Sequence, residues 1–269
     1  MGELRQTELV VIGAGPGGYA AAFRAADLGK QVLLIDRDPE LGGVCLNRGC
    51  IPSKALLHIS KVMDEATKLE KMGVKYGKPE IDIDQVRDHK NKIVSQLNSG
   101  IAQMANARKV ETIQGLASFV SNTELKVQTD TNDVTITFGQ CIIAGGSTSA
   151  MIPGVPTDHP SVITSRTALD LEDIPEKLLV VGGGAIGLEL GQVYAAFGTK
   201  VSVVEYLPNL LPGTDSDLVK PLQRKLKKQC EAIQLSSKVT KVEANKDGTL
   251  TVTIKNEKGS STEVFNKVL

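Results

Sequence analysis

The sequence predicts an α/β fold made of two three-layer domains, and an internal repeat carries this prediction. An apolar strand, a glycine-rich turn, an Ala-rich helix and a second strand follow one another twice within the 269 residues. The two copies keep a constant offset of 169 residues, because Gly182 follows Gly13 (182 − 13) and Glu205 follows Asp36 (205 − 36) by the same distance. Alternating strands and helices of this kind build parallel sheets that are covered by helices.

The first copy begins with a strand over residues 8–12, and the glycines of GAGPGG follow it at once. A helix runs from there to Leu28, Gly29 ends it, and a strand over 31–35 finishes on Asp36. In such a unit the first glycine permits a tight turn, the second admits a pyrophosphate, and the third lets helix and strand pack closely. The terminal acid accepts hydrogen bonds from a ribose.

The second copy has a strand over 178–181, the glycines of GGGAIG, a helix to Phe197, and a strand over 201–204 that finishes on Glu205. One Gly-x-Gly-x-x-Gly run alone is equally consistent with an ordinary glycine-rich turn. Here all parts occur in order and twice, so we expect two Rossmann-like dinucleotide-binding domains of the FAD/NAD(P)-binding type. Two such sites indicate electron transfer between two cofactors.

The remaining segments complete the predicted domains, 1–149 and 150–269. Apolar spacing predicts helices over 55–71 and 83–109, and alternation over 110–143 predicts a small antiparallel meander. Prolines mark a linker between the two domains. Asp215 is placed to cap a helix that runs to Lys228, and a hairpin follows from Val239, with turns at Asp247-Gly248 and Lys258-Gly259.

Composition narrows the class of protein. The 31 basic and 31 acidic residues cancel, so nothing favours nucleic acid or an acidic membrane surface as a partner. Aromatic residues are scarce at 3%, with no Trp, and no apolar run is long enough for a membrane span. The first residues resemble neither a secretory signal nor a transit peptide. We expect a cytoplasmic protein of bacterial type, with the mitochondrial matrix as the alternative.

Two of the four cysteines, Cys45 and Cys50, follow directly on the first repeat. A distorted first helical turn that contains Gly49 can bring them within bonding range, and a thiol at a helix N-terminus beside a lysine becomes a useful nucleophile. This pattern favours a redox disulfide. Zinc needs a second pair of ligands that the sequence lacks, so no metal site is predicted; purely structural cysteines are the other alternative. Cys141 and Cys230 are expected to be free, inert thiols.

The segment GGVCLNRGCIPSKALLH resembles the active-site segment of the dihydrolipoamide dehydrogenase family, within the pyridine nucleotide-disulfide oxidoreductases. GAGPGGYAAAFRAADLGK and VVGGGAIGLELGQVYAAFGTKVSVVE resemble the FAD and NAD segments of that family, and the similarity runs along the entire chain. The resemblance implies oxidation of dihydrolipoamide to lipoamide by NAD⁺ through FAD. It also implies a partner, the lipoyl domain of a 2-oxo-acid dehydrogenase complex, and a homodimer in the full-length family.

The same resemblance implies the site residues. Cys45 would exchange with the dithiol and Cys50 would face the flavin. Lys54 and Glu189, as part of the catalytic set, would form an ion pair between the two domains beside the flavin. The expected contacts with FAD involve Gly13, Gly15, Pro16, Gly17, Asp36, Arg37, Gly42, Gly43, Val44, Cys45, Lys54, Gly115, Ala117 and the turn Ala144, Gly145, Gly146 and Ser147. The expected contacts with NAD involve Gly182, Gly183, Gly184, Ala185, Ile186, Glu189, Glu205 and Val239.

The sequence also departs from the family. Members continue for roughly as much chain again, and the absent part carries the second FAD-contacting segment, the interface domain and its His–Glu acid/base pair. His58, His89 and His159 do not match that pair, so we expect impaired catalysis from these 269 residues alone. A catalytically incomplete FAD- and NAD-binding fragment is therefore the rival hypothesis. A reductase of the glutathione or mercuric type is another, although Glu205 with no following cation favours NAD over NADP.

Overall fold

The computed structural model describes residues 3–150 and 152–269, which divide into two compact units. The first comprises the chain up to Pro52 together with Asn91–Thr148, and the second comprises Ser53–Lys90 together with Ser149–Leu269. The segment 53–90, which the sequence analysis placed in the first domain, is thus grouped with the second unit. The assignment of FAD to one domain and NAD to the other stays a prediction.

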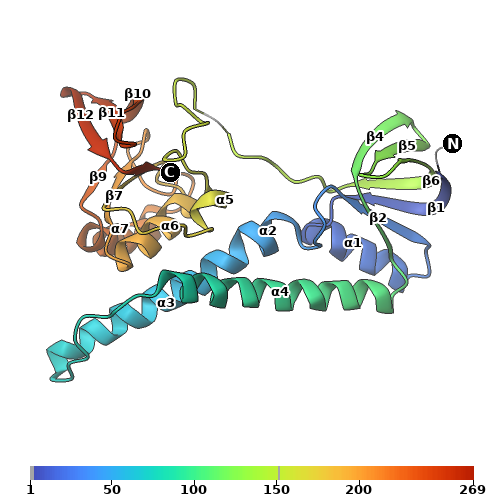
Figure 1. Ribbon diagram of the computed structural model, residues 1–269, viewed down its shortest axis with the longest axis horizontal. Coiled ribbons are helices and arrows are strands. Elements are labelled where there is room, and N and C mark those ends of the chain that lie inside the picture. Colours follow the sequence, from blue (N-terminus) through green and yellow to red (C-terminus); the bar gives the residue numbers. More distant parts are fainter. Residues whose placement is uncertain (1–2, 151) are drawn as a thin grey trace. The chain divides into compact units, whose positions relative to one another are not determined.

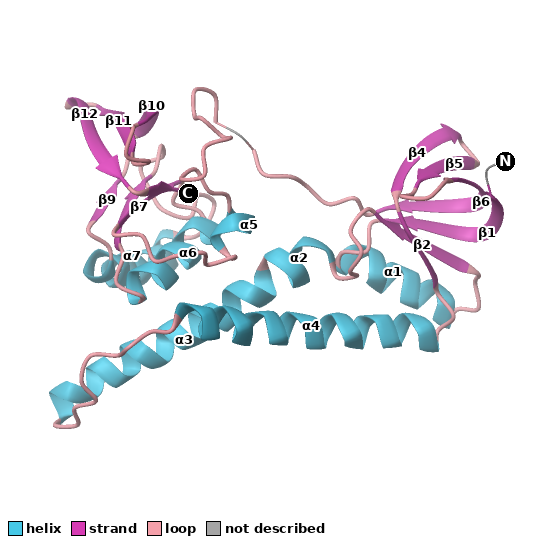
Figure 2. Cartoon of the chain, viewed as in Figure 1, coloured by secondary structure: helices cyan, strands magenta, loops and turns pink. Residues whose placement is uncertain are grey.

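A six-stranded sheet forms the first unit, in the order β3-β2-β1-β6-β5-β4 (Figures 1 and 2). Strands β1, β2 and β3 run parallel, and β6 pairs parallel with β1 along almost its whole length. Strands β4, β5 and β6 form the antiparallel part. The bounds are β1 (Glu3–Ile12), β2 (Val32–Asp36), β3 (Glu111–Gln114), β4 (Leu116–Ser121), β5 (Glu124–Gln128) and β6 (Asp133–Ile143).

Two apolar layers sandwich the parallel strands of this sheet. On one side, Phe23 of helix α1 (Pro16–Asp27) packs with Val11 and Leu34. On the other side, Leu125 and Val127 belong to the cluster that contains Val10, Leu33 and Ile35. Alternate residues of β1 and β2 therefore face opposite layers, as expected for strands that are buried on both faces.

The predicted meander over 110–143 is correct only for β4, β5 and β6. Strand β3 instead pairs parallel with β2, where Leu33 lies opposite Glu111 and Asp36 opposite Gln114. Strand β6 also belongs to the parallel part, because it pairs with β1 from Val134, opposite Glu3, to Ile143, opposite Ile12. Alternation of apolar residues identifies a strand but not the direction of its neighbour, which explains the error.

The second unit repeats the plan with a four-stranded parallel sheet in the order β13-β7-β8-β9. Its strands are β7 (Lys177–Val181), β8 (Lys200–Val204), β9 (Ala232–Gln234) and β13 (Lys267–Val268). Helices α6 (Ala185–Ala196) and α7 (Ser216–Gln229) contribute Leu190, Val193 and Leu226 to the apolar core on one face.

A small antiparallel sheet covers the other face, through a cluster in which Phe265 and Val252 pack with Leu179 of β7. It consists of β10 (Lys238–Ala244), β11 (Leu250–Asn256) and β12 (Gly259–Phe265). The predicted turn at Asp247-Gly248 is confirmed, whereas the second turn lies one residue earlier than predicted, at Glu257-Lys258, because Gly259 already pairs with Asn256. Helix α7 and the N-cap position of Asp215 are as predicted, but the Asp215 side chain makes no capping hydrogen bond, so only the capping interaction was predicted wrongly.

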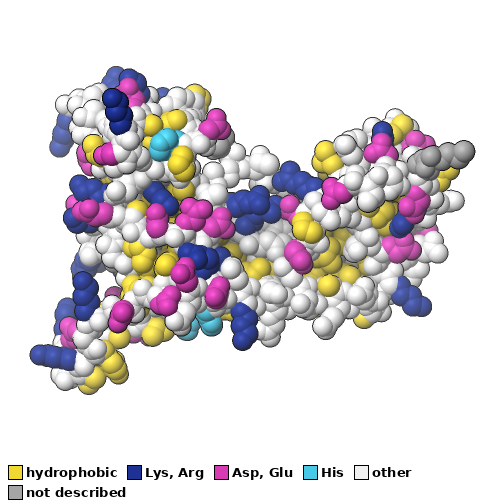
Figure 3. Space-filling view, viewed as in Figure 1, with side chains coloured by type: hydrophobic (Ala, Val, Ile, Leu, Met, Phe, Trp, Pro, Cys, Tyr) yellow, Lys and Arg dark blue, Asp and Glu magenta, His cyan; other side chains and the backbone are white. Residues whose placement is uncertain are grey.

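The remaining helices are α2 (Gly43–Arg48), α3 (Cys50–Leu69), a 3₁₀ turn at Glu70–Met72, α4 (Ile83–Ala107) and α5 (Ser165–Ala168). Among the described residues, no helix has both the length and the apolar character that crossing a bilayer requires. On the face that Figure 3 presents, Lys and Arg side chains are interspersed with Asp and Glu. The surface charges of this face are therefore mixed in sign, in line with the balanced composition.

Candidate functional site

The turn after β1 accepts only glycine at two positions. Gly13 has a φ of +98°, and a Cβ there would lie 2.2 Å from the carbonyl oxygen of Ala144. A Cβ on Gly18 would lie 1.7 Å from the carbonyl oxygen of Gly13. The turn therefore brings strand β1, helix α1 and the segment after β6 closer together than any side chain would permit. The N-terminus of α1 is left open above it.

Asp36 at the end of β2 is oriented by two backbone amides. The amide of Ala14 donates to Oδ2 at 2.5 Å, and the amide of Asp38 donates to Oδ1 at 3.0 Å. A carboxylate oxygen has two acceptor positions, so each oxygen keeps one for a ligand. Gly115 lies beside it, because its amide donates to the Asp36 carbonyl at 2.8 Å. This is the geometry that a ribose diol requires.

A pocket of about 560 Å³ lies over this turn, within the first unit. Gly43 forms its closest approach, since a Cβ there would be 2.6 Å from Cα of Gly15. Of the residues predicted to contact FAD, those that line the pocket are Gly13, Gly15, Pro16, Gly17, Asp36, Arg37, Gly43, Val44, Cys45, Ala144, Gly145 and Ser147. Such a groove, with glycines along its turn and at the start of a helix, fits a dinucleotide.

Four predicted residues do not line this pocket. Gly42 supports it, because its amide donates to the Ala14 carbonyl at 2.8 Å. Gly115 and Ala117 lie in and next to the β3–β4 turn, and Lys54 belongs to the second unit, so their contacts with FAD stay predictions. Gly146 of the expected 144–147 turn also lines the pocket. The lining residues that were not predicted are Asp38, Arg48 and Ile143, of which Arg48 and Asp38 form an ion pair. An Arg–Asp pair ten residues apart gives no periodic signal that could have predicted it.

The second turn reproduces the first. Gly182 has a φ of +112°, and a Cβ on Gly187 would lie 2.5 Å from the Gly182 carbonyl oxygen. Glu205 is buried, and it accepts from the amide of Gly183 at 2.6 Å and from the amide of Leu207 at 2.7 Å. As at Asp36, each carboxylate oxygen keeps one free acceptor position.

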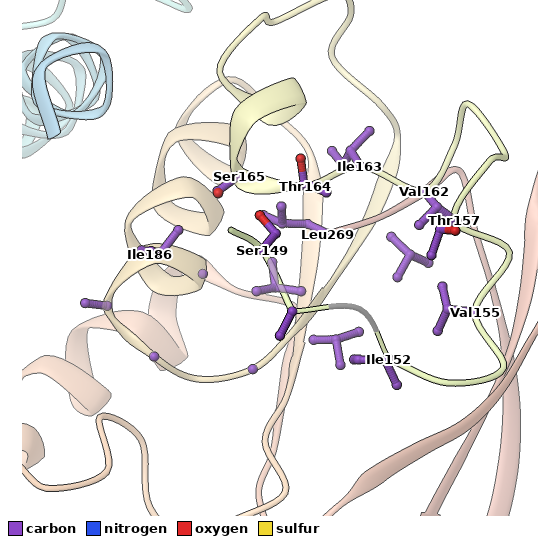
Figure 4. A pocket seen from close by; sticks show the side chains of 18 residues that line it. Ser149, Ile152, Val155, Thr157, Val162, Ile163, Thr164, Ser165, Ile186 and Leu269 are labelled. Carbon is purple, nitrogen blue, oxygen red and sulfur yellow. The ribbon is translucent and has the colours of Figure 1, made fainter. Parts of the chain in front are cut away.

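Two pockets in the second unit share Gly182. One of about 350 Å³ is lined by Glu205, Val239 and two residues that sequence reasoning missed, Tyr206 and Lys238. The other, of about 500 Å³, extends from Gly184 and Ile186 at the start of α6 to the segment before α5 (Figure 4). In Figure 4, Thr164 and Ser165 lie at the start of α5, beside the first turn of α6 that carries Ile186. Glu189 lines neither pocket.

Cys45 and Cys50 lie on either side of a helix break. Cys45 is in α2, Cys50 is the first residue of α3, and Gly49 separates the two helices. A Cβ on Gly49 would lie 2.8 Å from the Val44 carbonyl oxygen and 3.3 Å from Cα of Cys45, so glycine is needed for this close turn. The distorted turn at Gly49 was predicted from the sequence. Cys45 is half-buried and lines the first pocket, whereas Cys50 is exposed.

The comparisons with known proteins agree with this arrangement. The sequence profile of the family described as pyridine nucleotide-disulphide oxidoreductase matches residues 7–268. The chain belongs to this family. FAD and NAD, the cofactors predicted from the sequence, are the cofactors of these flavoprotein and pyridine nucleotide enzymes.

Individual proteins resemble the chain in sequence or in structure. It is 44% identical over 98% of its length to the dihydrolipoyl dehydrogenase of Haemophilus influenzae, and covers 55% of that protein. It is 41% identical over 93% of its length to the mitochondrial dihydrolipoyl dehydrogenase of Dictyostelium discoideum, and covers 51% of it. The Cu(II) complex of the HOCl-induced flavoprotein disulfide reductase RclA from Escherichia coli superimposes with a TM-score of 0.82, 26% identity, and coverage of 98% of this chain and 56% of that one. The chain thus spans about half the length of its curated relatives.

In this member of the family, Lys54 Nζ lies 2.6 Å from Oε1 of Glu189, and Ser53 Oγ is 3.4 Å from Oε2. The ion pair predicted from the sequence is therefore present. The expectation that it joins two domains was wrong, because helix α3 is divided after Pro52 and both residues belong to the second unit. The Lys54 side chain is 59% exposed and that of Glu189 31%. The pair is more exposed than the sequence analysis assumed, so its contribution to stability is about 0.2–1 kcal/mol. Its effect on a flavin stays a prediction.

The other two cysteines of this family member line none of the three pockets described above. Cys141 lies in β6 and Cys230 directly follows α7, and both thiols are free. Burial raises the pKa of each thiol above its ordinary value. Neither residue is placed for redox exchange. Among residues 3–150 and 152–269, no three His, Cys, Asp or Glu side chains are grouped so that they could hold a metal ion.

Proposed function

We propose that this chain forms the FAD-binding and NAD-binding parts of a flavoprotein disulfide oxidoreductase that oxidises dihydrolipoamide with NAD⁺. One observation carries the proposal: a carboxylate held by two backbone amides stands beside a glycine turn in both units, at Asp36 and at Glu205. Two dinucleotide sites in one chain support electron transfer between two cofactors. The names of the curated relatives support the choice of substrate.

FAD is assigned to the pocket of the first unit. The amides at the start of α1 face the place of the pyrophosphate, and the Asp36 oxygens accept from the ribose hydroxyls. The backbones of Gly43 and Gly15 pack against each other in the lining of this pocket, which a Cβ on Gly43 would prevent. Arg37 and Arg48 bring positive charge to the same pocket. When bound, FAD supplies the two-electron path between the cysteine pair and the nicotinamide.

NAD is assigned to the two pockets that share Gly182. Glu205 accepts from the adenosine ribose in the smaller pocket, where Val239 and Tyr206 offer apolar surface to the adenine. The start of α6, from Gly182 to Ile186, faces the pyrophosphate. The remaining half of the dinucleotide then occupies the larger pocket beside Thr164 and Ser165.

The chemistry at the cysteines is thiol–disulfide exchange. A thiolate of dihydrolipoamide attacks Sγ of Cys45, the Cys45–Cys50 bond breaks, and Cys50 leaves as a thiolate. The second substrate thiolate then attacks the substrate sulfur bound to Cys45, which closes the cyclic disulfide and releases Cys45. The substrate loses two electrons and the cysteine pair gains them. Overall, dihydrolipoamide and NAD⁺ give lipoamide, NADH and one proton.

A catalytically incomplete FAD- and NAD-binding fragment is the second candidate, and it is favoured by the coverage of only about half of each relative. Three measurements on the purified chain separate the two. Flavin absorbance tests retention of FAD, NADH oxidation by an artificial acceptor tests electron transfer between the cofactors, and NAD⁺ reduction by dihydrolipoamide tests the complete reaction. A Cys45→Ser variant should lose only the last activity. A chain that carries no flavin after expression and reconstitution contradicts both candidates.

The partner and the compartment follow from the same proposal. We propose that the substrate dithiol is presented by the lipoyl domain of a 2-oxo-acid dehydrogenase complex, that the full-length protein is a homodimer, and that it acts in the cytoplasm of a bacterium. The mitochondrial matrix is the alternative compartment, because the similar protein from Dictyostelium discoideum is mitochondrial. Co-purification with a lipoylated protein tests the partner directly.

A further inference from the structure

Five consecutive backbone carbonyls, those of residues 168–172, accept hydrogen bonds from three side chains that are distant in sequence. We call this segment the carbonyl run. Its donors are Tyr194 on α6 and two cations, Arg87 and Lys90, on the first turns of α4. Tyr194 Oη donates to the Ala168 carbonyl at 2.8 Å, and Lys90 Nζ donates to the Leu169 carbonyl at 2.7 Å. Arg87 Nε donates to the carbonyls of Asp170 at 2.9 Å and Leu171 at 3.2 Å. Arg87 Nη2 donates to the Glu172 carbonyl at 3.4 Å.

Lys90 is an unusual residue to find there, since its side chain is only 5% exposed. Burial lowers the pKa of Lys90, with the charge of Asp170 acting against this and that of Arg87 adding to it. A buried ammonium group is costly unless it has an acceptor, and an apolar side chain of similar size is often at least as stable. Within the described residues its hydrogen-bond acceptor is the Leu169 carbonyl. The cation therefore specifies a position more than it adds stability.

The segment that Lys90 holds in place adjoins α5, which forms one wall of the larger pocket. The carbonyl run continues directly from α5, a helix of four residues, and Thr164 and Ser165 at the start of α5 line that pocket (Figure 4). A single helical turn has no stability of its own. Its local hydrogen bonds include those from the Thr164 amide to Thr167 Oγ1 at 2.9 Å and from the Ala168 amide to the Thr164 carbonyl at 2.8 Å. Just before α5, the Ile163 amide donates to the Val268 carbonyl at 2.8 Å, which anchors the N-terminal side of the helix. The placement of α5 therefore depends on the anchors at both of its ends, and the carbonyl run is the one at its C-terminal end.

We propose that Lys90 and Arg87 are positioning residues for the half of NAD that lies beyond the pyrophosphate. By fixing the carbonyl run, they hold α5 so that the hydroxyl groups of Thr164 and Ser165 face the start of α6 across the pocket. This inference rests on the proposed function, in which NAD occupies the pockets that share Gly182. The adenosine pocket, with Glu205 and Val239, contains no residue of α5 or the carbonyl run.

That separation gives a test that a general loss of stability would not mimic. A Lys90→Met variant should raise the Kd for NAD⁺ by about 3- to 30-fold, the range seen for residues that act on a ligand through a packed network. Binding of adenosine monophosphate, which fills only the adenosine pocket, should be unchanged. Amide hydrogen exchange over residues 164–172 should accelerate in the same variant. Lys90→Arg, which keeps the positive charge, should keep the wild-type Kd for NAD⁺ and the wild-type exchange rate. Lys92→Met, at an exposed position on the same helix, should change neither quantity.

Arg87→Gln provides a second variant in case Lys90→Met does not fold, because the Arg87 side chain is partly exposed at 28%. Equal weakening of NAD⁺ and adenosine monophosphate, or unchanged NAD⁺ binding with either variant, overturns the inference. Failure of the wild-type chain to bind either nucleotide overturns the proposed function, and this inference with it. If the wild-type chain binds neither nucleotide and exchange over 164–172 is still faster in Lys90→Met, Lys90 stabilises this segment without a role in nucleotide binding.

Discussion

Asp36 and Glu205 make the same two hydrogen bonds in the two units of the chain. Each carboxylate accepts one hydrogen bond from a backbone amide of its glycine turn, that of Ala14 for Asp36 and that of Gly183 for Glu205. Each accepts a second from the amide of the residue two positions after the acid itself. The shorter Asp36 side chain achieves with one methylene what Glu205 achieves with two. In both units the carboxylate is oriented by the backbone, so no rotamer freedom is lost when a ribose binds.

The first prediction concerns cofactor choice. The chain should bind NADH at least about tenfold more tightly than NADPH, because a 2′-phosphate would meet the Glu205 carboxylate at close range. Glu205→Gln removes that charge and should narrow the ratio of the two dissociation constants. Fluorescence titration measures both, with Glu231→Gln, on the exposed segment after α7, as the control. Equal affinities in the wild-type chain would show that Glu205 does not contact the ribose.

The second prediction concerns the first turn. Gly13→Ala should abolish flavin retention, because its Cβ would fall 2.2 Å from the Ala144 carbonyl oxygen and the residue would keep a positive φ. Gly100→Ala, on helix α4 with nothing within 4 Å of the new Cβ, should retain flavin and fold at least as stably. The ratio of flavin to protein absorbance after gel filtration gives the answer. Normal flavin content in Gly13→Ala would contradict the assignment of this pocket.

The third prediction concerns the cysteines. Non-reducing peptide mapping should find Cys45 linked to Cys50, and Cys141 and Cys230 unlinked. Burial raises the pKa of the latter two thiols, so below that pKa they stay protonated and unreactive. Their alkylation by iodoacetamide in the folded chain should be slow at pH 7 and should rise only as the pH passes the ordinary value of 9.0. Rapid labelling of either one at pH 7 would refute this.

The fourth prediction concerns the Lys54–Glu189 pair. Glu189→Gln should change the free energy of unfolding by less than about 1 kcal/mol, because both side chains are partly exposed. It should nevertheless shift the reduction potential of bound flavin upward, since an unpaired ammonium nearby favours the anionic reduced form. Potentiometric titration of the reconstituted chain measures this shift. An unchanged potential would leave the pair without an electronic role.

The sequence by itself determined the repeated unit, because strand, turn, helix and acid are local features with their own patterns. The positive φ of Gly13 and Gly182, the hairpin turns of the small sheet and the helix break at Gly49 all follow from residue types at fixed spacing. Strand direction did not follow. Strand β3 alternates like its neighbours, yet it pairs parallel with β2.

Only the tertiary structure decided which distant groups meet. The Arg48–Asp38 pair, Lys238 beside the adenosine pocket, and the contacts of Lys90 with the carbonyl run join residues with no periodic relationship. Each depends on the packing of whole elements, and packing is set by the summed burial of many side chains rather than by any short pattern. For that reason the glycines and acids of this protein could be found from its sequence, whereas the cations that position its α5 wall could not.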